Sequence, residues 1–551
     1  MQKKIFVFGF CLLTASGTAF SQIKLDTGMI TAASTLIDLQ FSQAEKDSML
    51  DGLKDNEATF EKMHQNNLSN SQPYPFTFNP VPIGFPVPSK QEVVNWKIPD
   101  HVALPADRNE LAFYSVLQLA SLIKNKKISS VELTKFFLHR LHEWGDTLQC
   151  IISFTEDIAL SQAAQADDEL KRGIYRGPLH GIPYGLKDLF AVKGTITTWG
   201  ATPYKDQTVD EDAFVYSQLR KAGAVLCAKL SLGALAMGDV WFGGLTKNPW
   251  NTKTGSSGSS AGSTAATVAG LLPFAIGTET WGSIVSPSHT CGATGLRPTF
   301  GSVSRSGAMV LSWSLDKIGP ICRSAEDAAI VFYYIKGNDG KDAGAVTRAF
   351  NYTGKTNPAK LRIAYAVNYF EKLPAGAAEW AVLNEFKKLG CTPQPVVFPD
   401  STIYPFSIMD PIIGAECAAS FDELTRSNRD DLLTGQQKYD WPNQFRVARF
   451  IPAVEYINAN RHRYALIVKL NAFMKNYDVV IVPTFSGNQM AMTNLTGHPA
   501  ICMPIGFSKE GMPESITLLG NLFDEATLLA VAKAFQDSTD FNKKHPAMFR
   551  H

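Results

Sequence analysis

The chain has 551 residues, of which 45% are hydrophobic and 19% are charged, and its formal net charge is +1. These values are typical of a soluble globular protein with a sizeable core. Because the net charge is close to zero and the sequence has no dense run of lysine and arginine, nothing in it indicates electrostatic capture of nucleic acid.

The first 21 residues have the pattern of a secretory signal peptide. Lys3 and Lys4 precede an apolar run over residues 5–13, and small and polar residues follow up to Ser21. The run is shorter than the roughly 20 residues that cross a bilayer. We therefore expect a signal peptide over residues 1–21, no stable membrane insertion, and a secreted or periplasmic mature protein.

Residues 22–110 predict an N-terminal extension in two parts. Helical spacing covers residues 36–53, whereas residues 71–107 are rich in proline and aromatic residues, which is typical of an extended strap. Such an extension could pack on the surface, shape the entrance of a cleft or mediate assembly, and we expect simple packing. One domain is predicted over residues 111–541, followed by a C-terminal tail over residues 542–551.

Helical and strand patterns alternate beyond the extension. Ser129 or Ser130 is expected to cap one helix, with Glu132 in its first turn. This alternation predicts an α/β fold with a mixed, mainly parallel sheet that helices cover on both faces. Helices are predicted over residues 114–125, 129–144, 156–171 and 213–222, and strands over residues 151–154 and 224–230.

Two regions carry the residues that are candidates for chemistry. Lys187 ends the run Gly181-Ile182-Pro183-Tyr184-Gly185-Leu186-Lys187, which Asp188 follows. The second region begins with a Gly- and Ser-rich run over residues 254–263 and ends Gly277-Thr278-Glu279-Thr280-Trp281-Gly282-Ser283. Between its ends we expect a small-residue helix that Pro273 ends and a buried strand that starts at Phe274. A flexible linker needs no such element, so the hydroxyls and glycines favour a catalytic site lined by backbone N–H groups.

These runs, in this order and spacing, resemble the amidase signature family over about residues 114–541. The resemblance implies a single large α/β/α sandwich, an amidase catalytic domain and no cofactor. It also implies hydrolysis of a carboxamide to a carboxylic acid plus ammonia or an amine. By the same resemblance, Ser283 is the nucleophile, Lys187 is the base and Ser259 is the hydroxyl that bridges them.

The family pattern further implies an oxyanion hole made by the backbone N–H groups of Thr280, Trp281, Gly282 and Ser283. Ser260 is expected to lie beside them at the site. Relatives have a cis peptide bond at the bridging serine, so an unusual backbone is expected between Gly258 and Ser260.

The chemistry is coherent only if the amine of Lys187 is uncharged when it acts. The reference pKa of a lysine is about 10.4, and a value of ~7–8 requires burial without a carboxylate partner. Asp188 is adjacent in sequence, but on a strand it would point to the opposite face.

The sequence departs from the commonest family pattern at two positions. Trp281 stands where glycine is usual, and Val285 replaces a common arginine, which resembles the peptide-amidase branch. We expect position 281 to tolerate a side chain and the indole to form a wall of the pocket.

The seven cysteines beyond the signal peptide are dispersed, without a Cys-x-x-Cys pair. No His/Cys cluster has zinc spacing, so we expect no metal. A disulfide framework is not expected, although a single bridge stays open.

Three alternatives compete with an exported amidase. Ser260 lies in a Gly-x-Ser-x-Gly run that also fits the nucleophile of an α/β-hydrolase, with His462 or His498 as its base. The glutaminase (A) subunit of a tRNA-dependent amidotransferase shares the signature, but the signal peptide argues against it. The third is a binding protein on a catalytically impaired amidase scaffold, which Trp281 suggests.

The main prediction is therefore an amidase that acts on a small-molecule or peptide amide and has no nucleic-acid partner. The sequence leaves open which amide it cleaves and whether the chain forms a homodimer.

Overall fold

The computed structural model describes residues 25–65, 67–72, 76–83, 85, 89–399 and 406–551. The predicted signal peptide, residues 1–21, lies outside them. The chain divides after Asn67 into two compact units. This boundary differs from the predicted one at residue 110, because the second part of the extension packs with the catalytic body.

The first unit contains two helices, α1 (Thr27–Leu36) and α2 (Gln43–His64). The Asp26 side chain accepts a hydrogen bond from the N–H of Met29 and so caps α1. Ser42 and Glu45 form a capping box at the start of α2. The predicted helical stretch over residues 36–53 is therefore interrupted between the two helices.

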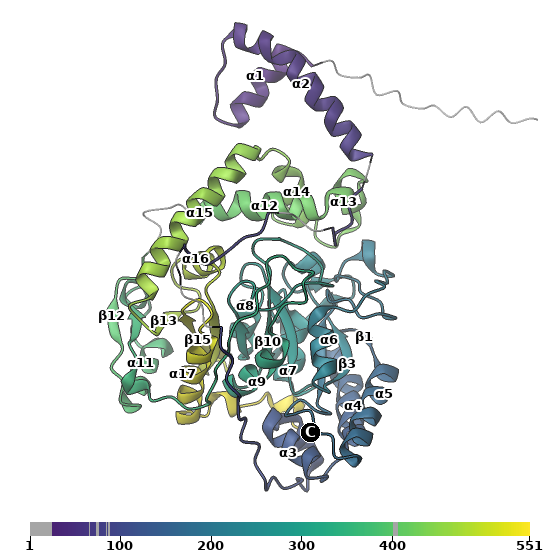
Figure 1. Cartoon of the computed structure of the whole chain (residues 1–551), viewed down its shortest axis with the longest axis vertical. Helices are drawn as coiled ribbons and strands as arrows, with labels where there is room; N and C mark the ends of the chain where they lie inside the picture. The colour runs from purple at the N-terminus through teal and green to yellow at the C-terminus, as the bar shows by residue number, and fades with distance from the viewer. Residues whose placement is uncertain (1–24, 66, 73–75, 84, 86–88, 400–405) are drawn as a thin grey trace, which may run out of the picture. The chain divides into compact units, whose positions relative to one another are not determined.

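The second unit is built on one eleven-stranded sheet (Figure 1). In spatial order its strands are β1 (Ile151–Phe154), β3 (Val225–Leu230), β2 (Pro183–Lys187), β8 (Ala275–Glu279), β10 (Lys317–Cys322), β9 (Thr294–Arg297), β14 (Ala500–Phe507), β15 (Pro513–Gly520), β13 (Val479–Pro483), β11 (Ile363–Ala366) and β12 (Gln394–Val396). Four short strands form two small separate sheets: β4 (Val240–Trp241), β5 (Gly244–Leu245), β6 (Lys247–Asn248) and β7 (Asn251–Gly255).

The predicted mixed sheet is confirmed. The sheet contains two blocks of parallel strands, β3–β2–β8 and β13–β11–β12. The predicted parallel pairing is found in these two blocks. The pairs from β8 through β13 and the edge pair β1–β3 are antiparallel. A short turn joins β14 to β15, and such a connection allows only antiparallel pairing.

Helices cover both faces of the sheet, as predicted. Ile318 of β10 belongs to the core that contains α9, whereas Ile321 packs with Ile284 and Val268 from the segment of α7 and α8. The helices of the catalytic body are α3 (Val116–Lys124), α4 (Ser130–Leu148), α5 (Glu156–Lys171), α6 (Phe214–Lys221), α7 (Ala261–Val268), α8 (Val285–Cys291), α9 (Ala325–Ile335), α10 (Val367–Phe370), α11 (Ala378–Lys388), α12 (Met409–Ser420), α13 (Asp422–Arg426), α14 (Trp441–Ala448), α15 (Ala453–Met474), α16 (Gln489–Thr496) and α17 (Glu525–Ser538).

The strap and the tail both pack on the catalytic body. The described residues between 67 and 107 contain no helix or strand, as the proline-rich composition predicts. Phe78 of this strap lies edge-to-face on Phe300, with ring centroids 4.9 Å apart. At the other end of the chain Phe549 is fully buried, and the Arg140 guanidinium donates to its carbonyl. Residues 542–551 are therefore part of the folded body.

All seven cysteines of the described residues are buried and free of disulfides. Among the residues that the structure describes, no helix combines the length and the apolar character that a bilayer crossing requires.

Candidate active site

Lys187 is the last residue of β2, and its side chain is fully buried. Its Nζ lies 2.8 Å from Ser259 Oγ, 3.2 Å from Ser260 Oγ and 2.9 Å from Thr278 Oγ1. The amine is thus surrounded by three hydroxyls. Burial lowers the pKa of Lys187 to about 7, even though the charges of Asp316 and Glu279 act to raise it.

The neighbouring carboxylate is engaged elsewhere. Asp188 is fully buried and forms an ion pair with Lys229 of β3, at 2.7 Å between Oδ1 and Nζ. Its Oδ2 accepts hydrogen bonds from the N–H and the hydroxyl of Thr198. The prediction that Asp188 points away from Lys187 is therefore confirmed, and alternation along a strand is its cause.

The loop before α7 carries two of the three hydroxyls that surround Lys187. Its Gly258–Ser259 peptide bond is cis, which matches the unusual backbone expected there. The Oγ of Ser260 donates to the carbonyl of Thr278 and accepts from its N–H, both at 3.1 Å. The N–H of Ser260 also donates to the carbonyl of Ser283 at 3.1 Å. One residue thus connects the loop to β8 and to the predicted nucleophile.

Ser283 lies in the turn between β8 and α8. The side chain of Glu279, the last residue of β8, stabilises that turn. Glu279 Oε2 accepts hydrogen bonds from the N–H groups of Ile284 and Val285, each at 2.9 Å. Burial acts to raise the pKa of Glu279, but the charges of Arg297 and Lys317 outweigh it and lower the pKa to about 2. The carboxylate is therefore a fixed anion that positions the residues after Ser283.

The backbone of this turn accommodates Trp281 without strain. Gly282 adopts a φ of 93°, which favours glycine, whereas Trp281 is absent from the non-glycine residues with positive φ. The prediction that position 281 tolerates a side chain is confirmed. The indole is 45% exposed, and the expectation that it forms a wall of the substrate pocket stays a prediction.

Three functional contacts were not predicted from the sequence. Thr278 is a third hydroxyl on Lys187, Glu279 holds the turn, and Asp316 accepts a hydrogen bond from Thr280 Oγ1 at 2.6 Å. Thr278 and Glu279 lie inside the run from Gly277 to Ser283. The sequence therefore indicated their positions near the site, but it did not indicate their roles. Asp316 lies outside both motifs, directly before β10, so neither motif indicated it.

The α/β-hydrolase alternative finds no support in these contacts. The titratable group in contact with Ser260 is Lys187. His498 is fully buried against Thr496, at 2.9 Å between Nδ1 and Oγ1, and burial lowers its pKa to about 3. His462 lies on the exposed surface of α15.

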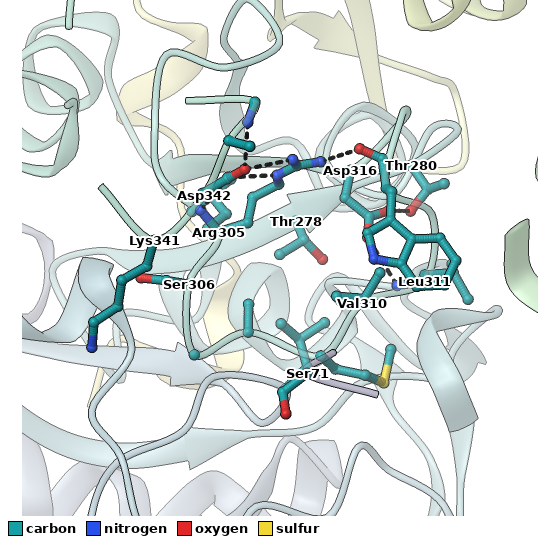
Figure 2. Close-up of a pocket in the computed structure, with 18 of the residues that line it drawn as sticks. Ser71, Thr278, Thr280, Arg305, Ser306, Val310, Leu311, Asp316, Lys341 and Asp342 are labelled. Atoms are coloured by element: carbon teal, nitrogen blue, oxygen red, sulfur yellow. Dashed lines mark hydrogen bonds and ion pairs between the residues drawn. The ribbon is translucent and has the colours of Figure 1, made fainter. Parts of the chain in front are cut away.

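A cavity of about 320 Å³ reaches the site at Thr278 and Thr280 (Figure 2). Arg305 lies on its wall in a bidentate ion pair with Asp342, at 2.8 Å for each contact. Figure 2 shows Thr278 beside Arg305 among the residues that line the cavity. Within the described residues, no group of three or more His, Cys, Asp and Glu side chains is arranged to hold a metal ion.

Known proteins are similar to this chain in sequence and in fold. The family model described as Amidase matches residues 132–492. The chain is 34% identical over 481 residues to the (A) subunit of glutamyl-tRNA(Gln) amidotransferase from Marinomonas sp. (strain MWYL1), and the match covers 79% of this chain and 98% of that protein. The corresponding protein of Coxiella burnetii (strain Dugway 5J108-111) is also 34% identical, over 484 residues, 79% of this chain and 99% of that protein.

Among solved structures, the native peptide amidase from Stenotrophomonas maltophilia superimposes with a TM-score of 0.69. It is 28% identical, and the match covers 78% of this chain and 98% of that one. The fold, the family match and these relatives agree: the chain belongs to the amidase signature family and is an amidase.

Proposed function

We propose that this chain hydrolyses a carboxamide through an acyl-enzyme on Ser283, with Ser259 and Lys187 as the proton relay. The environment of Lys187 is the observation that carries this proposal. At its ordinary pKa of 10.5, roughly one amine in three thousand would be neutral at pH 7, whereas at a pKa of about 7 half of them are. A buried, half-neutral amine 2.8 Å from a hydroxyl is a competent general base.

The proposed relay joins the observed contact between Lys187 and Ser259 to a proton transfer from Ser283 to Ser259. Ser283 Oγ attacks the amide carbonyl carbon while its proton passes to Ser259 Oγ, and the proton of Ser259 passes to Lys187 Nζ. The tetrahedral oxyanion is stabilised by N–H groups of residues 280–283. The relay then returns a proton to the leaving nitrogen, the C–N bond breaks, and ammonia or an amine departs. Water cleaves the ester of Ser283 by the same relay and releases the acid.

The first candidate for the biological role is a free-standing, exported amidase. The signal-peptide pattern of residues 1–21 supports export, and the likeness to peptide amidase supports action on an amide such as a peptide amide.

The second candidate is a glutaminase (A) subunit-like role in a tRNA-dependent amidotransferase. The curated relatives favour this alternative over the exported amidase, since those at 34% identity are named for the glutamyl-tRNA(Gln) amidotransferase. Both candidates require the same hydrolytic step at Ser283, and they differ in substrate, compartment and partner.

Ammonia release tests the shared chemistry. The purified protein is assayed with a panel of primary carboxamides, peptide C-terminal amides and L-glutamine, and Ser283→Ala serves as the blank. Ser286→Ala, three residues away in the same segment, is the matched control and should keep its activity. A fluorophosphonate probe should label the wild type and the control but not Ser283→Ala. Activity that survives Ser283→Ala would contradict the proposed nucleophile.

The same panel separates the two candidates. Preference for L-glutamine, with an intact N-terminus in the cytosol, supports the subunit-like role. Cleavage after Ser21 in the native host, with preference for other amides, supports the exported amidase.

A further inference from the structure

The cavity beside the candidate active site is bounded on one side by the N-terminal strap. Ser71 and Gln72 line it together with Thr278, whose Oγ1 lies 2.9 Å from Lys187 Nζ. Figure 2 shows Ser71 on the opposite side of the cavity from Arg305. Ser71 and Gln72 are exposed, so they form the rim of the cavity rather than its floor.

The rim is fixed to the catalytic body by a reciprocal pair of hydrogen bonds. The Asn70 carboxamide donates from Nδ2 to the carbonyl of Val310 and accepts at Oδ1 from the N–H of Val310, both at 2.8 Å. Phe78 lies further along the strap. The guanidinium of Arg463, from α15, lies 3.5 Å from the centroid of its ring. These contacts hold the strap on both sides of the residues that line the cavity.

This rim comes from a part of the chain outside the residues that match the family model, which begin at residue 132. Val310, its anchor, lies within the matched residues. The extension therefore contributes one side of a cavity whose lining residues beyond the strap all fall within the matched range. We infer that the strap around Ser71 is a specificity determinant, which sets the size of the substrate group that the cavity admits where it reaches the site, at Thr278 and Thr280.

The cavity wall indicates the chemistry of that group. Leu189, Met309 and Ile318 provide a buried apolar surface. Arg305 is already neutralised by Asp342, and Lys341, the other cation of the lining, is exposed to solvent, so neither presents a buried unpaired charge to an anionic group. At about 320 Å³ the cavity is at the small end for ligand sites. The inferred occupant is a compact, largely apolar substituent of the amide substrate.

This inference rests on the proposed nucleophile, and the test separates the two. A methyl fluorophosphonate and a 4-phenylbutyl fluorophosphonate are compared by their rates of labelling at Ser283, since labelling requires no knowledge of the natural amide. Ser71→Phe narrows the rim, and we expect labelling by the bulky probe to fall about tenfold or more, while the small probe changes by less than about twofold. The matched control is Ser69→Phe, because Ser69 is exposed and does not line the cavity.

A second variant releases the rim without adding bulk. Asn70→Ala removes both contacts with Val310, and we expect the ratio of bulky to small labelling rates to rise about threefold or more. Thermal melts of each variant confirm that it is folded. Unchanged ratios in both folded variants would overturn the inference while leaving the nucleophile in place. Absence of labelling in the wild type would overturn the proposed function itself.

Discussion

Replacing Lys187 with methionine should abolish activity and at the same time stabilise the fold at neutral pH. The difference between a pKa of 10.5 and one of about 7 corresponds to about 5 kcal/mol, at about 1.4 kcal/mol for each pKa unit. This is the free-energy cost of burying the protonated amine in the folded state. Methionine has a similar shape and no charge, so Lys187→Met removes this penalty.

The substitution also removes the hydrogen bonds to Ser259, Ser260 and Thr278. At about 1 kcal/mol each, their loss offsets part of the gain. We therefore expect Lys187→Met to raise the free energy of unfolding by about 2 kcal/mol at pH 7.

The pH dependence of the free energy of unfolding is a sharper test than the size of its change at pH 7. Between pH 7 and 10.5 the unfolded chain carries a proton on Lys187 that the folded chain lacks. Raising the pH in this window therefore stabilises the wild type relative to Lys187→Met, by about 1.4 kcal/mol for each pH unit. Urea unfolding of both proteins at pH 7, 8, 9 and 10 measures this difference.

Lys229 provides the matched control, because it is a second fully buried lysine on the adjacent strand. Its partner Asp188 would be left as an unpaired buried carboxylate, so Lys229→Met should destabilise the fold by about 3–5 kcal/mol. Equal pH slopes for wild type and Lys187→Met, or destabilisation by both substitutions, would refute the argument that Lys187 is held uncharged.

Three further outcomes follow from the site. The rate constant for fluorophosphonate labelling of Ser283 should rise with pH through about 7 and then level off, because Lys187 must lose its proton to act as a base; a flat profile from pH 5 to 9 would contradict this. Glu279→Gln should lower the free energy of unfolding by about 3–5 kcal/mol, since the buried Arg297 loses its carboxylate at 2.8 Å, and a urea titration that finds less than about 1 kcal/mol would show that the pair is dispensable. Trp281→Ala should change the free energy of unfolding by less than about 0.5 kcal/mol, because the indole is half-exposed, and a larger loss in the same titration would show that it packs.

Local sequence patterns predicted many elements of the fold. The predicted helix over residues 156–171 and the strand over residues 151–154 coincide with α5 and β1. Ser129 caps α4 with Glu132 as its capping-box partner, because the cap depends on residues only three positions apart. By contrast, α7 ends before Gly270, whose φ is 66°, and not at Pro273. A left-handed glycine ends a helix as effectively as a proline does, and the prediction weighed only the proline.

The candidate site was predictable where a motif carried it and not where distant segments meet. The motifs led to Lys187 and Ser259, and the structure brings their side chains into contact. The contact between Asn70 and Val310 joins residues 240 positions apart, and no periodicity or spacing encodes such a pair. The antiparallel direction of the strands between β8 and β13 could not be predicted from the sequence either, because it depends on which strands become neighbours in the sheet.

The buried cysteines allow unfolding of the protein to be measured through the reactivity of its own thiols. Burial raises the pKa of Cys150 to about 12 and that of Cys502 to about 11, so neither thiol is ionised at neutral pH. The thiolate is the reactive form, and a folded molecule should resist alkylating reagents and oxidants alike. Once a molecule unfolds, its thiols become reactive within the same chain. Mass spectrometry after a pulse of iodoacetamide would then count open molecules directly, without a dye or an engineered label.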